Sequence, residues 1–337
     1  MKSTFLELGL NAISTDHAVN SMIQTSLRGV DSHGINLFPH YCRAIQSGRI
    51  SQNPDFKISQ DKEAAATLDA DHAIGHHAGI VAVEKCIEMA NSTGIGAVGV
   101  KNSTHFGAAA YFSLFGASKN LITFAFTNAD ALVKAHNSKS AYFGTNPICM
   151  AAPMKNEQPF ILDMATSIVS WNKVKNYQQE GLKLPLGWAC DESGIPVTDP
   201  HLAKSLNPTG LYKGFGLGMI VDILCSLLAS GPISRDILPM FTSPILAKRK
   251  IGHFFIAINI SSFVSVQVFK ERLQDMADQI RSLPNTGNDS VMIPGDPEKK
   301  SLKVRSQEGI PIEDLKFKEF ISINEDFALS LKNEASS

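Results

Sequence analysis

The chain of 337 residues is 44% hydrophobic and has a formal net charge of -1, so it can bury a large core but has no broad basic surface for nucleic acid. Its N-terminus lacks the apolar run of a secretory signal, and no stretch is apolar for long enough to span a bilayer. We therefore expect a globular, cytoplasmic protein with neither nucleic acid nor a membrane as its partner. The five cysteines lie far apart and are odd in number, which favours reduced thiols in the core.

The first segment, residues 1–60, is expected to be mainly helical. Thr15 and Asp16 can cap a helix that ends at Gly29, because apolar residues recur between them at helical spacing. A second helical pattern resumes after the stretch "VDSHGI". Ser32 and His33 therefore lie at a junction between two helices.

The second segment, residues 61–260, alternates strand and helix patterns, which is typical of an α/β fold. Helix patterns cover residues 75–94 and 105–120, and strand patterns cover 64–71, 95–102, 121–128, 146–152, 160–163 and 253–260. The third segment, 261–337, adds a long amphipathic helix over 263–283 and is expected to pack back on the core. The three segments are thus predicted to interlock.

Residues 214–231 form a helix pattern that is apolar around nearly its whole circumference, which predicts a buried central helix. Asp222 interrupts this pattern. Because an unpaired carboxylate in a core is costly, we expect Asp222 to be held by structural hydrogen bonds.

Two motifs are weighed and set aside. The stretch "GIGAVG" matches a dinucleotide fingerprint, but its glycines follow a helix and lead into a strand, so Gly94 is predicted to end the helix. His72 and His76 have the spacing of zinc ligands on one helix, but Gly75 and the preceding strand pattern disfavour that helix. We expect no metal site.

Polar side chains stand where three predicted strands end. His105 lies between a strand and a helix, just before the small residues Gly107 and Ala108 that let a ligand approach the backbone. Asp130 and Asp163 follow the ends of two other strands. A helix N-terminus beside small residues is a ready site for an anion such as the phosphates of a cofactor.

Eight motifs in order give the chain a resemblance to a known family. They are "VDSHGI", "HFGAAAYF", "GTNPICMAAP", "LDMATS", "GWACDESGIPVTDP", "YKGFGLG", "HFFIAINI" and "PGDPE". Together they resemble the malate/L-lactate dehydrogenase family, the group without a Rossmann fold that includes ureidoglycolate, sulfolactate and diketogulonate oxidoreductases. The resemblance implies a mixed-sheet α/β fold with peripheral helices, and a homodimer with active sites near the subunit interface. It also implies NAD- or NADP-dependent oxidoreduction of a carboxylic acid at the carbon next to the carboxylate.

The resemblance also assigns residues. His33 resembles the proton donor to the substrate carbonyl, with Ser32 orienting it, and the chemistry suits an imidazole that titrates near neutrality. His105 and Asp130 match further active-site groups, and Thr145 matches a threonine that contacts substrate. The expected cofactor contacts are Gly107, Ala108, Asp163, Met164, Ala165, Lys213, Gly295 and Asp296.

One departure from the family pattern bears on the substrate. Many relatives have an arginine four residues after the histidine, where it can bind a carboxylate, but this chain has Leu37. Arg43 or Lys134 is the replacement we consider. The expected substrate is therefore a 2-oxo or 2-hydroxy acid larger than lactate. Alternatives are reduction of a cyclic or N-substituted imino acid, and a binding or regulatory protein that keeps the fold without turnover.

Overall fold

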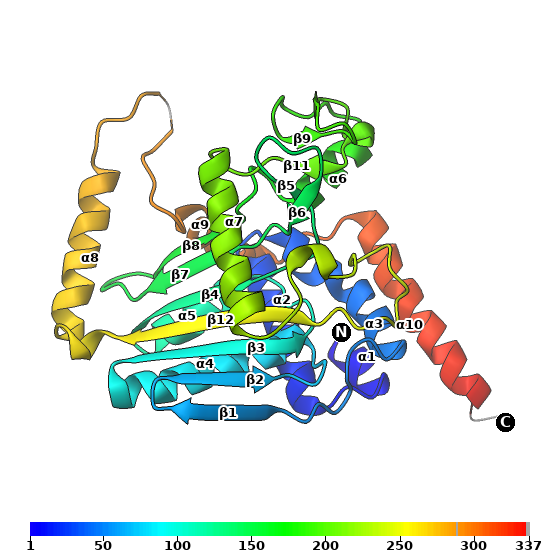
Figure 1. Ribbon diagram of the computed structural model, residues 1–337, viewed down its shortest axis with the longest axis horizontal. Helices are drawn as coiled ribbons and strands as arrows, with labels where there is room; N and C mark the ends of the chain where they lie inside the picture. The colour runs from blue at the N-terminus through cyan, green and yellow to red at the C-terminus, as the bar shows by residue number, and fades with distance from the viewer. Residues whose placement is uncertain (288, 335–337) are drawn as a thin grey trace.

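The computed structural model describes residues 1–287 and 289–334, with the side chains at 324 and 326–334 left aside. Its centre is a seven-stranded mixed sheet in the order β1-β2-β3-β12-β4-β7-β8 (Figure 1). Only β2 and β3 are paired in parallel; the other neighbours are antiparallel. The strands are β1 (Lys57–Lys62), β2 (Ala65–Asp69), β3 (Ile95–Ser103), β4 (Leu121–Thr127), β7 (Ile148–Ala152), β8 (Phe160–Met164) and β12 (Ile251–Asn259). The predicted mixed-sheet α/β fold is confirmed.

Helices α4 (Gly75–Thr93) and α5 (Ala110–Ser118) pack on one face of this sheet. A Cβ on Gly96 of β3 would lie 2.3 Å from the carbonyl oxygen of Cys86, so a side chain there would push α4 off the sheet. Gly94 ends α4 with a φ of +89°, and β3 follows directly. The interpretation of this glycine as a helix end is confirmed.

The N-terminal helices α1 (Lys2–Glu7), α2 (Ala12–Leu27) and α3 (Phe38–Gln46) form a second apolar cluster, which α10 (Asp314–Glu334) joins along α3. The predicted start of α2 is wrong. Asn11 caps the helix by accepting a hydrogen bond from the Ser14 N–H at 2.9 Å, whereas Thr15 is buried inside it. The 3-10 turn Asp31–His33 does lie between α2 and α3, as expected.

A smaller five-stranded sheet stands above the main one in Figure 1. Its strands are β5 (Val133–Lys134), β6 (Ala141–Phe143), β9 (Ala189–Cys190), β10 (Pro196–Val197) and β11 (Ser205–Leu206), and α6 (Trp171–Gln179) packs against it. The sequence patterns did not predict this sheet, because strands of two or three residues have no measurable periodicity.

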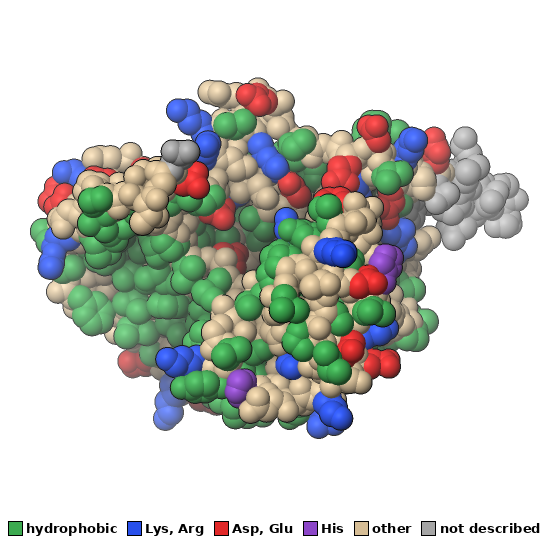
Figure 2. All heavy atoms as spheres, turned by 90° about the horizontal axis from the view of Figure 1, so that it is seen from above, with side chains coloured by type: hydrophobic (Ala, Val, Ile, Leu, Met, Phe, Trp, Pro, Cys, Tyr) green, Lys and Arg blue, Asp and Glu red, His purple; other side chains and the backbone are tan. Residues whose placement is uncertain are grey.

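Helix α7 (Tyr212–Asp222) continues as the π-helical turn Ile223–Leu228. The prediction of a buried helix is wrong. Val221 and Cys225 pack on the main sheet, but the opposite side is open, with Leu227 64% exposed. Figure 2 shows hydrophobic side chains gathered in broad areas on either side of a hollow.

Asp222 is held as expected. Its carboxylate accepts hydrogen bonds from Ser234 N–H at 3.0 Å, from Ser234 Oγ at 2.7 Å and from Ser226 Oγ at 3.2 Å. These bonds tie the segment after the π-helical turn to α7 and compensate the burial of the carboxylate.

Helices α8 (Val266–Arg281) and α9 (Asp296–Glu308) complete the chain before α10. All five cysteines are free and buried. Among the described residues, no helix has both the length and the apolar character needed to cross a membrane.

Candidate active site

A cavity of about 1000 Å³ opens between α2 and the main sheet, beside α5 and β8. Its walls come from α2, the turn that carries Ser32 and His33, the start of α5, the end of β8 and the loop before α9. A volume of this size lies at the upper end of ligand-binding sites in proteins.

His33 faces this cavity from the short turn between α2 and α3. Its Nδ1 lies 2.8 Å from Ser32 Oγ, which fixes the orientation of the ring and leaves Nε2 without a protein partner among the described residues. Burial lowers the pKa of His33 below its ordinary value, so the neutral imidazole prevails at pH 7.

His105 stacks on His33, with ring centroids 5.7 Å apart. Its Nδ1 is 3.3 Å from the Gly107 N–H and 2.7 Å from the Tyr41 hydroxyl. A backbone N–H can only donate, so Nδ1 is the acceptor and the proton of the neutral ring is on Nε2. Burial, with smaller effects of His33 and Arg249, holds the pKa of His105 well below its ordinary value. His105 is therefore a neutral Nε2–H donor.

Gly107 has a left-handed φ of +76° at the edge of the cavity. A Cβ at this position would lie 2.7 Å from Nε2 of His76 on α4. His76 is fully buried and neither of its ring nitrogens has a protein partner among the described residues. Gly107 therefore forms the cavity floor and separates the cavity from the buried imidazole of His76.

Asp163, at the end of β8, accepts a hydrogen bond from the Ala110 N–H at the start of α5, at 2.8 Å. Its side chain is open to the cavity but surrounded by protein, and this burial raises its pKa to about 6, against the opposing effect of the Ala110 hydrogen bond. No acceptor is found in the described chain for the N–H groups of Ala108 and Ala109. These two groups remain free to donate to a ligand.

The cavity brings together eight of the thirteen residues expected from the sequence: Ser32, His33, Gly107, Ala108, Thr145, Asp163, Ala165 and Gly295. Five do not line it. His105 stacks on His33, Met164 is the strand neighbour of Asp163, and Lys213 is exposed on α7. Asp130 and Asp296 are engaged in ion pairs.

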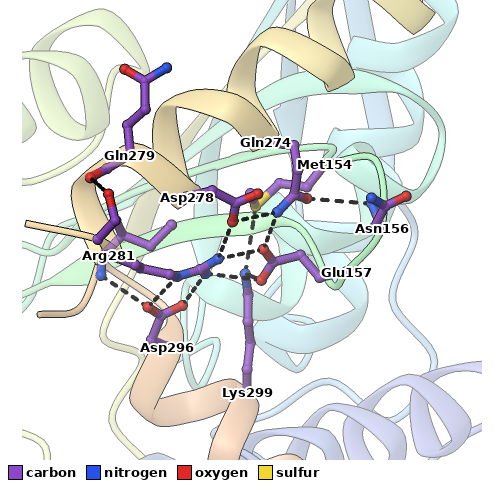
Figure 3. A network of polar contacts seen from close by, with 11 residues as sticks. Met154, Asn156, Glu157, Gln274, Asp278, Gln279, Arg281, Asp296 and Lys299 are labelled. Atoms are coloured by element: carbon purple, nitrogen blue, oxygen red, sulfur yellow. Dashed lines mark hydrogen bonds and ion pairs between the residues drawn. The ribbon is translucent and has the colours of Figure 1, made fainter. Parts of the chain in front are cut away.

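Asp296 belongs to a polar network between α8, α9 and the loop before β8 (Figure 3). Arg281 donates to its carboxylate at 2.6 and 3.0 Å, and also donates to Glu157 at 2.7 and 3.0 Å. Lys299 donates to the same Glu157 at 2.6 Å. Asp296 therefore holds Gly295 in place beside the cavity.

Asp130 accepts a hydrogen bond from Arg249, a buried residue just before β12. Sequence reasoning missed Arg249 and Tyr41. Tyr41 stands eight residues after His33, but Arg249 is 119 residues from its partner Asp130 and has no local signal.

The two cations proposed as replacements lie outside the cavity wall. Arg43 is half-exposed and pairs with Glu319, and Lys134 donates to the Gly194 carbonyl oxygen at 3.1 Å. Leu37 is buried in the N-terminal apolar cluster, so position 37 does not face the cavity either.

His72 and His76 do not share a helix, because His72 precedes α4 with a left-handed φ of +58°. In the part of the chain that the structure describes, no group of three or more His, Cys, Asp or Glu side chains could hold a metal ion.

The chain is similar to known proteins over most of its length. A family model described as malate/L-lactate dehydrogenase matches residues 1–320. The malate dehydrogenase of Pyrococcus abyssi is 35% identical over 304 residues, which cover 87% of this chain and 83% of that protein. The NAD(+) ureidoglycolate dehydrogenase of Escherichia coli is 29% identical over 315 residues, or 93% of this chain and 90% of its own. The crystal structure of malate dehydrogenase from Entamoeba histolytica superposes with a TM-score of 0.92 at 28% identity, over 97% of this chain and 95% of that one.

The mixed-sheet fold and the relatives named as dehydrogenases define an oxidoreductase of hydroxy acids. The chain belongs to the malate/L-lactate dehydrogenase family. The family resemblance of its eight motifs is thereby confirmed.

Proposed function

We propose that this protein transfers hydride between NAD or NADP and C2 of a 2-oxo or 2-hydroxy acid larger than lactate, as a homodimer in the cytoplasm. The observation that carries the proposal is the stacked pair His33 and His105 at the edge of a cavity of about 1000 Å³. Two stacked, half-buried imidazoles with separate partners suit proton transfer at a carbonyl oxygen.

The residues at the cavity fit a dinucleotide. Gly107 and Gly295 have left-handed backbones that bring the main chain close to a ligand, and the free N–H groups of Ala108 and Ala109 can donate to phosphate. The Asp163 carboxylate is suited to accept from a hydroxyl or an amide. When bound, a nicotinamide would supply or accept the hydride at C2.

The chain's own groups would handle the proton. In the oxidation direction, neutral His33 accepts the hydroxyl proton on Nε2, since Ser32 occupies Nδ1. In the reduction direction, protonated His33 returns it to the carbonyl oxygen. His105 donates from Nε2–H throughout and stabilises negative charge on that oxygen, because Tyr41 and Gly107 hold its Nδ1 as an acceptor.

The exposed apolar side of α7 and its π-helical turn supports a homodimer. Met219, Ile220, Leu227 and Leu228 are each at least 49% exposed, which is unusual for neighbouring large apolar residues of a monomer. Lys213 lies at the start of the same helix, so the cofactor contact expected of it would be made in the partner's cavity. Leu227→Glu should shift the protein to a monomer in analytical ultracentrifugation.

The experiment that tests the proposal is an absorbance assay at 340 nm with NADH and NADPH over a panel of 2-oxo acids and cyclic imino acids. We expect turnover of at least one 2-oxo acid, and activity should survive exhaustive chelation. The absence of cofactor oxidation with every acid in the panel, by a folded protein, would contradict the proposal. Turnover of pyruvate above that of all larger acids would contradict the substrate size.

A further inference from the structure

We propose that Arg249 binds the carboxylate of the substrate, an inference that rests on the proposed function. A 2-oxo acid carries a carboxylate on the carbon next to the one that reacts. The proposed reaction therefore requires a cation close to the two stacked histidines, and a guanidinium is the side chain best shaped to bind a carboxylate.

Arg249 is placed beside these histidines. It stands just before β12 and is 5% exposed. With Tyr41 and His105 it lines a second, smaller cavity of about 10 Å³. This space holds about one water-sized group, hence one carboxylate oxygen, while the rest of the acid would lie against His105 and His33.

The donors of Arg249 are only partly used. Nε donates to the Leu238 carbonyl oxygen at 2.7 Å, and Nη2 donates to Asp130. Within the described residues, Nη1 has no hydrogen-bond partner. The protein thus fixes the guanidinium through Nε and Nη2, and Nη1 is available to a ligand.

The charge balance around Arg249 also favours an anion. Arg49 lines the same small cavity and is 2% exposed, but it donates only to neutral acceptors, at Met240, Ser243 and Pro244. Of these two buried guanidiniums, only Arg249 has a carboxylate partner among the described residues, Asp130. Because uncompensated buried charge is costly, binding a substrate carboxylate would relieve this imbalance.

Other cations are less well placed. Arg28 lines the main cavity, but it bonds to Gln158 at 3.4 Å and interacts with the carboxylate of Glu298, at the end where Gly295 lies. Lys175 interacts with Asp130, but its ammonium group lies over the ring of Phe241 and it lines neither cavity. Arg249 is the cation that adjoins His105.

The test compares binding of oxamate, a carboxylate analogue of 2-oxo acids, with binding of oxamide, in which an amide replaces the carboxylate. Both are titrated calorimetrically into the protein with and without NADH. The wild type should prefer oxamate. Arg249→Met should weaken oxamate by about 10- to 100-fold and abolish the preference, while Arg249→Lys should retain part of it.

Three further measurements make the result of this test interpretable. Arg249→Met leaves Asp130 unpaired and can unfold the protein, so the neutral pair Arg249→Met with Asp130→Asn is measured beside it. Arg235→Met removes an exposed arginine and should leave the preference unchanged. With the best 2-oxo acid of the panel, the KM should rise far more than kcat falls in Arg249→Met.

A folded Arg249→Met protein that still prefers oxamate as the wild type does would overturn the inference. Failure of the proposed function would look different, because the wild type would then oxidise neither NADH nor NADPH with any acid. The titration without cofactor still decides the role of Arg249 in that case.

Discussion

Arg305 holds the carboxylate of Asp31 with both of its terminal nitrogens, at 2.6 and 2.9 Å, and also donates to the Ser26 carbonyl oxygen at 2.6 Å. Asp31 directly precedes Ser32 and His33, and Arg305 lies on α9, which begins at the Gly295 wall of the cavity. This ion pair therefore ties the turn that carries the proposed proton-transfer histidine to the helix beside the proposed cofactor.

Arg305→Met should misplace that turn. We expect a loss of about 1 kcal/mol in the free energy of unfolding, because the pair is partly exposed, and a fall of about 10-fold in the rate of hydride transfer. Lys303→Met, on an exposed position of the same helix, is the matched control. The comparison uses chemical denaturation and single-turnover absorbance, and a rate equal to that of the control would show that the pair is only structural.

The elements that could be predicted are those with long, uniform patterns. Helix α4 and strands β3, β4 and β12 each have seven residues or more and lie in the core, so periodicity alone located them. The helix start at Asn11 was missed because Thr15 is also a good cap by composition, and the choice depends on packing that buries Thr15. The exposed side of α7 could not be predicted. A helix that is apolar on all sides is expected to be buried, but its sequence does not show which part of the protein covers each side.

The residues that line the candidate site could be predicted where motifs are contiguous. Ser32 and His33 adjoin in sequence, and Gly107 follows His105 by two residues. Arg249 was not predictable, since its pairing with Asp130 depends on how β4 and the segment before β12 come together. Asp296 stands in the motif "PGDPE", but its ion pair with Arg281 depends on the position of α8.

Gly107→Ala should disturb the cavity floor. The new Cβ would lie 2.7 Å from His76 Nε2, at a residue whose φ is +76°. We expect a loss of about 2–3 kcal/mol of stability, the sum of backbone strain and the clash, together with weaker binding of NADH. Gly48→Ala is the matched control, because its φ is +78° and nothing lies within 4 Å of the added Cβ. Equal losses of stability in the two variants would refute the clash with His76.

Asp163 should make stability depend on pH in a defined direction. Its folded pKa is raised to about 6, above the ordinary value of 3.8, so the protonated form stabilises the fold below about pH 4 and this contribution is lost as the pH rises through 6. Asp163→Asn should therefore gain stability relative to the wild type between pH 4 and 7. We expect no more than about 1 kcal/mol, because the side chain is open to the cavity.

The measurement is the denaturation midpoint of both proteins at each pH. The exposed Asp275 on α8 supplies the control, and Asp275→Asn should run parallel to the wild type. A difference between Asp163→Asn and the wild type that shrinks as the pH rises would have the wrong sign for a raised pKa.

His33→Asn tests the proton-transfer role directly. Asparagine keeps a polar group near Ser32 but cannot exchange a proton with the substrate oxygen, so kcat should fall by about 10²–10⁴-fold, or roughly 2.7–5.4 kcal/mol, while NADH still binds.

In the wild type, the lowered pKa of His33 predicts that kcat/KM for reduction falls as the pH rises through a value below 6.5, since the protonated ring is required. The same ionisation should make oxidation rise and then level off. A structural histidine would instead lower the melting temperature and reduce activity only in proportion to the unfolded fraction. Near-normal single-turnover transfer in a stably folded His33→Asn protein, with its pH profile intact, would pass the role to His105, whose proton lies on Nε2.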